Sequence, residues 1–393
     1  MKQFDSINTK KWKLMHDDAI TQNDKEKMCQ FIMSNEKLSY GERCREMERL
    51  WSEWLGVKYS VFVNSGSSAN LILVQAMHDL YGRYGRSDWI AQSCTWATNI
   101  APILQLKSSS QGIYMTDVDM KTLGLDIDNV EHYIKKHNVR YIFVTHVLGI
   151  PSISQKLIDL CVKHNIIMLE DCCESHGSTW NGKKVGTFGK ASTFSFFYGH
   201  HITSIEGGMV CTDDEELYHH LLLLRSHGML RELPELERTK RKVDGVDERF
   251  TFLCSGYNVR NTDLNAVLGI SQMARLDNAV CVREQNFRIY LDRLDSSKYH
   301  TDMVCVGSSL FAFPIIRLDG NIHKVSKALK ENGIDNRPLI AGNLFRHPMM
   351  HGVNTYVIEG KADFIHDNSL YVGNSEFIGI NEIERLVRIL NAI

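Results

Sequence analysis

Tyr141-Ile142-Phe143-Val144-Thr145-His146-Val147 and Ile166-Ile167-Met168-Leu169-Glu170-Asp171 are two apolar runs that favour β-strands. Between them, Ser154 to His164 has the pattern of a crossover helix. Two parallel strands joined by such a helix form a right-handed βαβ unit, which predicts an α/β fold. Ligands of such sheets bind at the carboxyl ends of the strands, so Asp171 is expected to face a pocket. The alternative is an acid that only caps a loop at the strand end.

A strand and a helix upstream frame a possible anion site. Tyr59 to Val63 is a β-prone run, Asn64-Ser65-Gly66-Ser67-Ser68 follows as a turn, and a helical pattern begins after it. Backbone N–H groups at the start of a helix attract anions, because the helix dipole is positive there. Gly66 and Ser67 are therefore candidate phosphate-binding residues. A helix that is simply capped by serine is the other interpretation.

Downstream, Thr193-Phe194-Ser195 has the pattern of a strand that ends in serine, and a short segment leads from it to Gly207-Gly208. That segment holds two neighbouring histidines, His200 and His201. Histidine can move protons near neutral pH. Successive side chains of an extended segment face opposite sides, so only one of the two should face a site.

Together these pieces resemble the sugar aminotransferase family of fold type I pyridoxal phosphate (PLP) enzymes, the DegT/DnrJ/EryC1/StrS type. The resemblance runs from about residue 25 to the C-terminus and implies an aspartate aminotransferase-like α/β fold. Such a fold has a large domain with a mixed, mostly parallel sheet and a smaller C-terminal α/β domain. We expect the N-terminal helices and the PLP-binding domain at 1–271 and the small domain at 272–393. The matching segments are Ser65–Asn70, Trp96, Glu170–Gly177, Gly186–Gly189, Ser195–Gly208 and Gly256–Arg260.

The resemblance also implies how the cofactor is held. Asp171 would keep the pyridine nitrogen protonated, so that the ring accepts electrons. Trp96 could stack on the ring, although most tryptophans with apolar neighbours belong to a core. Members of the family are usually homodimers with a shared active site, so Asn258 would reach the cofactor phosphate of the neighbouring subunit. The implied cofactor-binding residues are Gly66, Ser67, Trp96, Asp171, Ser195 and Asn258.

One position departs from most of the family, because His200 stands where a lysine binds PLP covalently. Within the family this change marks the 3-dehydratases, and the chain resembles those of colitose biosynthesis. The resemblance implies that L-glutamate converts PLP to pyridoxamine phosphate (PMP) and that His200 then removes a proton. The C3 hydroxyl of a nucleotide-linked 4-keto sugar would leave, in deoxysugar synthesis for a surface polysaccharide. Glu174, three residues beyond Asp171, could lie near the ring hydroxyl as a second catalytic group.

The implied sugar is GDP-4-keto-6-deoxy-mannose or a heptose relative. Arg231 and Arg337 are candidate contacts, and Arg337 could instead form a structural salt bridge. Gly199 and Asn261 differ from the serine and proline of the enzymes that the chain resembles, which leaves the sugar open. A nucleotide-sugar 4-aminotransferase with another base and a non-catalytic protein of the same fold are the alternative functions.

Some 3-dehydratases hold an iron–sulfur cluster and need a reductase partner. In them two cysteines are separated by one residue and another follows eight positions on. The ten cysteines of this chain lack that spacing. We therefore predict no cluster, no other metal and no reductase partner.

Composition is compatible with this class. The 393 residues are 43% hydrophobic and can bury a large core, and a formal net charge of −2 argues against nucleic acid as a partner. Met1 to Ser6 lacks an apolar signal core and no run is long enough to span a bilayer, so we expect a cytoplasmic protein with reduced thiols. The mixed charges of Glu235 to Asp244 predict a solvated loop.

Overall fold

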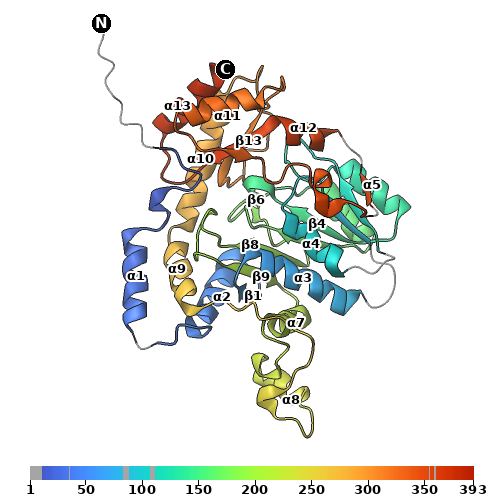
Figure 1. The fold of residues 1–393 in the computed structure, drawn as a ribbon. Coiled ribbons are helices and arrows are strands. Elements are labelled where there is room, and N and C mark those ends of the chain that lie inside the picture. The colour runs from blue at the N-terminus through green and yellow to red at the C-terminus, as the bar shows by residue number, and fades with distance from the viewer. Residues whose placement is uncertain (1–10, 35, 83–87, 107–110, 354, 358–359) are drawn as a thin grey trace.

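The computed structural model describes residues 11–34, 36–82, 88–106, 111–353, 355–357 and 360–393 (Figure 1). The opening residues Met1 to Ser6, whose composition bears on a signal segment, lie outside these ranges. None of the helices in the described ranges has both the length and the apolar content that crossing a bilayer requires.

A sheet of eight strands forms the centre of the large domain, in the order β1-β9-β8-β5-β4-β2-β3-β12. Within this sheet β9 alone runs antiparallel to the rest, so the expected mixed, mostly parallel sheet is confirmed. The βαβ unit is also confirmed, because β4 and β5 pair in parallel and α6 (Gln155–Lys163) connects them. The strands are β1 Tyr59–Val63, β2 Asp88–Gln92, β3 Ile113–Thr116, β4 Val139–Thr145, β5 Ile167–Asp171, β8 Ala191–Ser195, β9 Gly208–Thr212 and β12 Thr355–Val357.

Helices cover both faces of this sheet, because alternate side chains of its strands are apolar on both sides. In β1, Val61 and Val63 pack into one buried cluster while Phe62 packs into another. One face carries α3 (Gly66–Tyr81), α4 (Ala97–Leu106) and α7 (Glu215–Arg225). The opposite face carries α2 (Glu42–Leu55), α5 (Ile127–Lys136), α6 and α9 (Asp263–Met273), and α1 (Gln22–Met33) packs on α9.

The C-terminal part builds a second core around a three-stranded antiparallel sheet, in the order β10-β13-β11. Between 273 and 276 the chain passes from α9 to α10, which packs on α13. Residues 344 to 353 and the strand β12 return to the large domain, where β12 pairs with β3. The division of the chain at 271 and 272 stays a prediction. The elements are α10 Leu276–Arg293, β10 Ala312–Ile316, α11 Ile322–Glu331, β11 Arg337–Pro338, α12 Lys361–Asn368, β13 Ser369–Gly373 and α13 Ile380–Asn391.

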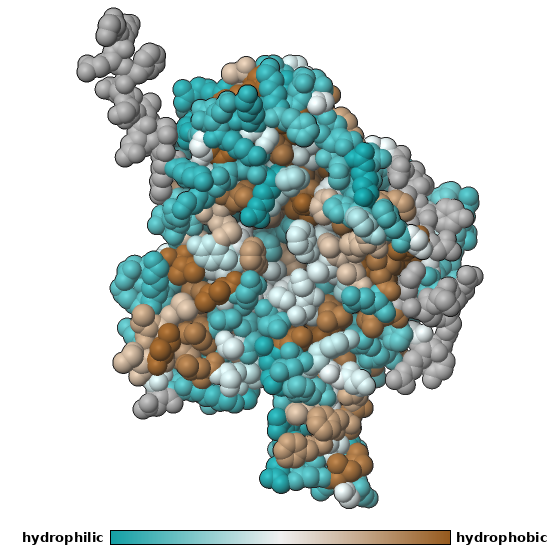
Figure 2. Space-filling model, viewed as in Figure 1, coloured by the Kyte–Doolittle hydropathy of each residue, from teal (hydrophilic) through white to brown (hydrophobic). Residues whose placement is uncertain are grey.

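The segment expected to be a solvated loop is partly helical. It forms α8 (Glu235–Lys240), which lies on an arm, residues 235–252, that projects from the body below α7 (Figure 1). The helix contains no buried residue, so the prediction of solvation is right and the prediction of a loop is wrong. Glu237 pairs with Lys240 at 2.7 Å and with Arg241 at 3.2 Å, and pairs at such spacings stabilise a helix. The arm also exposes apolar side chains (Figure 2), namely Leu236, Val243, Val246, Phe250 and Phe252.

Candidate active site

A cavity of about 420 Å³ opens beyond the carboxyl ends of β4, β5 and β8, between the large sheet and the small domain. It brings together eight of the ten residues that the sequence analysis proposed for the site. Asn258 and Arg231 do not line it. The eight are Gly66, Ser67, Trp96, Asp171, Glu174, Ser195, His200 and Arg337.

The turn between β1 and α3 forms a small cradle at one wall of the cavity. Ser65 caps the helix by accepting a hydrogen bond from the backbone N–H of Ser68 at 3.0 Å, and Gly66 begins the first turn. A Cβ on Gly66 would lie 2.6 Å from Cβ of Ser195 and 2.9 Å from Sγ of Cys173. Only glycine therefore lets this helix start approach the end of β8. The cradle joins a helix N-terminus to serine hydroxyls, and these donors fit a phosphate group.

Asp171 is buried at the end of β5, where three N–H groups fix its carboxylate. Asn70 and Asn99 donate to Oδ2 at 3.0 and 2.6 Å, and the backbone N–H of Cys173 donates to Oδ1 at 2.8 Å. Thr193 in turn donates its hydroxyl to Asn70 at 2.7 Å. A carboxylate held in this way across from a phosphate cradle suits the protonated nitrogen of a phosphorylated pyridine. Asn99 has no recognisable sequence signal, because the helix that carries it lies far from Asp171 in the chain.

Glu170, the residue directly before Asp171, stabilises the fold. Its carboxylate accepts hydrogen bonds from the backbone N–H groups of Gly186, Phe188 and Gly189, each at 2.7 Å. His146 accepts from Ser152 N–H at Nδ1, so its Nε2 carries the proton that faces Glu170 at 3.2 Å. Glu170, His146 and Cys172 have the donor types of a metal site. The hydrogen bonds occupy the Glu170 oxygens and make this cluster a support for the loop at 186–189.

His200 faces the cavity, whereas His201 does not. The Nδ1 atom of His200 lies 3.4 Å from the carbonyl oxygen of Ser195, which can only accept, so the lone pair of the neutral ring is on Nε2. The rings of Phe197 and Phe311 meet His200 edge-on at 5.8 and 5.5 Å. Burial lowers the pKa of His200 to about 4, so the ring is a neutral base at physiological pH. His201 is buried behind it with Nε2 2.7 Å from the carbonyl oxygen of Ser309, in agreement with the expected alternation.

Glu174 lines the same cavity in the opposite protonation state. Burial raises the pKa of Glu174 to about 8, and the charge of Asp171 acts in the same direction. The backbone N–H of Leu148, which donates to Oε2 at 2.7 Å, opposes this rise. Leu148 has a φ of 57°, an uncommon conformation for a branched residue, and this conformation accompanies the hydrogen bond. At neutral pH the site therefore pairs a neutral base with a protonated acid.

Three more side chains complete the wall of the cavity. Trp96 is 52% exposed, so it belongs to the cavity surface and not to a core. Arg337 lies on β11 next to Tyr371 of β13. Tyr371 also lines the cavity and meets Phe311 edge-on at 5.9 Å. Tyr371 was missed from the sequence, because a tyrosine in a β-prone run is indistinguishable from a core residue.

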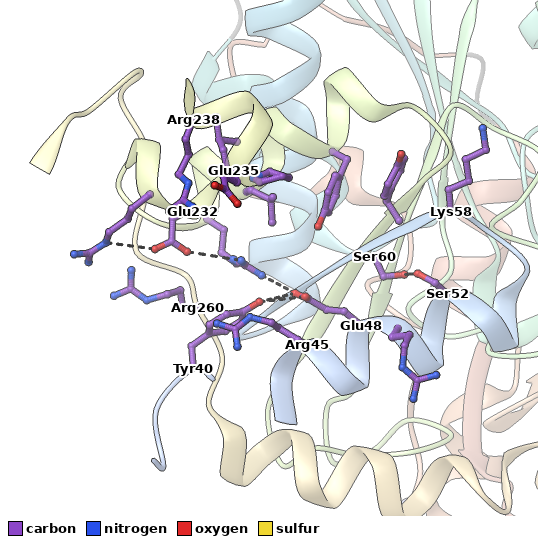
Figure 3. Close-up of a pocket in the computed structure, with 18 of the residues that line it drawn as sticks. Tyr40, Arg45, Glu48, Ser52, Lys58, Ser60, Glu232, Glu235, Arg238 and Arg260 are labelled. Carbon is purple, nitrogen blue, oxygen red and sulfur yellow. Dashed lines mark hydrogen bonds and ion pairs between the residues drawn. The ribbon is translucent and has the colours of Figure 1, made fainter. Parts of the chain in front are cut away.

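Arg231 lines a second hollow. This groove of about 1070 Å³ lies beside β1, between α2 and α7, and Figure 3 shows Arg45, Glu48 and Arg260 on its wall. Its centre is a buried ion pair in which Arg225 donates to Glu48 at 2.6 Å. Arg45 and Arg260 add positive charge to its wall. Asn258 is exposed two residues before Arg260. Asn258 and Arg231 are therefore presented to the outside, away from the cavity of their own chain.

Comparisons with known proteins agree with this geometry. A family model described as the DegT/DnrJ/EryC1/StrS aminotransferase family matches residues 19–372. GDP-4-keto-6-deoxy-D-mannose 3-dehydratase of Yersinia pseudotuberculosis is 34% identical over 372 residues, which are 92% of this chain and 94% of that protein. The solved structure of the E. coli enzyme of that name with bound hydrated PLP has a TM-score of 0.88 at 31% identity, and covers 96% of this chain and 99% of its own. A structure of GDP-4-keto-6-deoxymannose-3-dehydratase with a trapped PLP-glutamate geminal diamine has a TM-score of 0.87 at 30% identity, covering 96% and 100%.

Proposed function

The chain belongs to the DegT/DnrJ/EryC1/StrS aminotransferase family, and on that premise we propose that it is a PLP-dependent 3-dehydratase of a GDP-linked 4-keto sugar. The substrate would be GDP-4-keto-6-deoxy-mannose or a heptose relative. The observation that carries the proposal is that none of the described residues lining the cavity is a lysine, while His200 faces it. A site without a lysine amine cannot bind PLP as a Schiff base, so PLP and PMP are held by non-covalent contacts alone.

The bound cofactor supplies an electron sink. In this proposal the α3 start and Ser195 hold its phosphate, Asp171 binds its ring nitrogen and Trp96 covers its ring. The fixed hydrogen bonds of Asp171 support this assignment, because an immobile carboxylate orients the ring without reorganisation.

His200 and Glu174 move the protons. His200 accepts a proton at Nε2, because its Nδ1 is committed to the carbonyl oxygen of Ser195. Glu174 holds a proton at neutral pH and can give it to the departing C3 hydroxyl, which leaves more readily as water. The rings of Phe197 and Phe311 give His200 a partly apolar surround. A histidine cannot form the covalent bond to the cofactor that a lysine would form, so loss of the C3 oxygen competes with amination at C4.

Glutamate is the amino donor in this proposal. The solved relative that traps a PLP-glutamate adduct supports the choice. Arg337 lines the cavity and has an exposed side chain that can bind a carboxylate of the donor. No iron–sulfur cluster and no reductase take part, since the cysteine spacing does not suit a cluster.

We also propose a homodimer with shared active sites. Asn258 and Arg231 lie outside the cavity of their own chain, where they can complete that of a second copy. The exposed apolar side chains of the arm, among them Leu236 at 68% and Phe250 at 59% exposure, would be covered in such an assembly (Figure 2).

The test is a product assay with PLP, glutamate and GDP-4-keto-6-deoxy-mannose, read by mass spectrometry. The proposal predicts a sugar that has lost one oxygen and keeps its ketone, together with 2-oxoglutarate. A stable 4-amino sugar would make the protein an aminotransferase. Failure to bind PLP and PMP would leave a non-catalytic protein, and 2-oxoglutarate without any change in the sugar would redirect the search to other nucleotide sugars.

A further inference from the structure

Two residues of the cavity wall, Leu14 and Met15, come from the segment Lys11–His16, which we call the N-terminal strap. The strap precedes α1, far in sequence from the other lining residues. Leu14 and Met15 line the cavity together with Gly199 and His200.

The strap is fixed at both ends. Trp12 donates its backbone N–H to the carbonyl oxygen of Gly333 at 3.0 Å, and its indole N–H to that of Gly373 at 2.9 Å. The Trp12 side chain is buried in the core of the small domain. At the other end, the ring of His16 stacks on Phe377 at 5.0 Å. Leu14 and Met15 are thus held over the cavity between two anchors on the small domain.

Two glycines, one from each domain, make room for the strap. A Cβ on Gly373 would lie 2.3 Å from the carbonyl oxygen of Leu14. A Cβ on Gly199 would lie 3.0 Å from Sδ and 3.4 Å from Cγ of Met15. The Met15 side chain therefore lies against Gly199, directly before His200 in the chain, and a side chain at 199 would press on it.

We propose that Met15 is a positioning residue for His200: it fills the space beside Gly199 and, with the ring edges of Phe197 and Phe311, fixes the imidazole in the cavity. This inference rests on the proposed function, in which His200 is the base. A base must be held close to its proton, and a displacement of about 1 Å can cost roughly a hundredfold in rate. Because the strap is anchored to the small domain, the position of that domain sets the position of the base.

An exchange of side-chain size between positions 15 and 199 tests whether the two side chains compete for the same space. Gly199→Val adds volume where Met15 lies, Met15→Ala removes it, and the double variant exchanges the two. Unfolding in urea of the four proteins without cofactor gives a double-mutant cycle. We expect the double variant to unfold at a higher urea concentration than the sum of the single effects predicts. Additive effects would show that the two residues do not share space and would overturn the inference.

The rate of the half-reaction with glutamate tests whether Met15 positions His200. In Met15→Ala we expect the rate of 2-oxoglutarate formation to fall roughly tenfold to a hundredfold, while the KM for glutamate and the affinity for PLP stay unchanged. Met15→Leu keeps the volume and should restore most of the rate. An unchanged rate in Met15→Ala, or an equal loss of PLP affinity, would overturn the inference. Absence of 2-oxoglutarate with the wild-type protein would instead overturn the proposed function, and the unfolding cycle would still decide the contact.

Discussion

Replacement of Glu174 by glutamine should change the pH dependence of stability in a direction that the structure fixes. The amide oxygen of Gln can accept the Leu148 N–H as the carboxylate oxygen does, but the side chain no longer titrates. Burial raises the pKa of Glu174 from its ordinary 4.5 to about 8. Between these two values the folded protein holds a proton that the unfolded chain has released. The free energy of unfolding of the wild-type protein therefore falls as the pH rises from 4.5 to 8.

The size of that loss follows from the shift. At about 1.4 kcal/mol for each pKa unit, ionising Glu174 inside the fold would cost on the order of 4 to 5 kcal/mol. The side chain borders a cavity that admits water, so screening reduces the cost, and we expect roughly 2 kcal/mol. Groups that do not interact with Glu174 titrate equally in both proteins and cancel in the comparison.

The measurement is urea unfolding of wild-type protein and Glu174→Gln without cofactor, at about pH 5 and about pH 8.5. We expect the variant to gain roughly 2 kcal/mol relative to wild type at the higher pH. The basic limb of the pH–rate profile near pH 8 should also disappear in the variant. An equal pH dependence of stability in both proteins, or a relative loss for the variant at high pH, would refute the reasoning.

Three further predictions concern the cradle, the loop support and the shared site. Gly66→Ala places a Cβ 2.6 Å from that of Ser195, so PLP affinity in equilibrium dialysis should fall at least about tenfold; unchanged affinity would exclude Gly66 from the cradle. Glu170→Ala leaves three backbone N–H groups without their acceptor. The free energy of unfolding should therefore fall by at least about 3 kcal/mol in urea unfolding. A loss below about 1 kcal/mol would show that Glu170 does not hold the loop at 186–189. Mixing Asn258→Ala with His200→Gln protomers should restore one intact site in each mixed dimer and raise dehydration activity above that of either variant alone; no gain would argue against a shared site.

Local sequence signals located much of the site. The β1 turn and the β4-α6-β5 unit were predicted correctly because their elements follow one another directly in the chain and each has a local sequence pattern. The pattern from Ser195 to Gly208 led to His200 for the same reason, and the structure places that side chain in the cavity.

The remaining features depend on contacts between distant segments. The site receives Asn99 from α4, Tyr371 from β13 and Met15 from the N-terminal strap. None of these residues has a local sequence signature. The return of β12 to the edge of the large sheet is likewise set by long-range pairing. The arm helix α8 was missed because it has no apolar face, and its ion pairs are weak signals in a charged run.

The most direct test of the account follows the C3 oxygen itself, with substrate labelled by oxygen-18 at C3 and the wild-type protein supplied with PLP and glutamate. The account predicts labelled water, a 3-deoxy-4-keto sugar, 2-oxoglutarate and ammonia in equal amounts. Label retained in a 4-amino sugar, with no ammonia released, would contradict it.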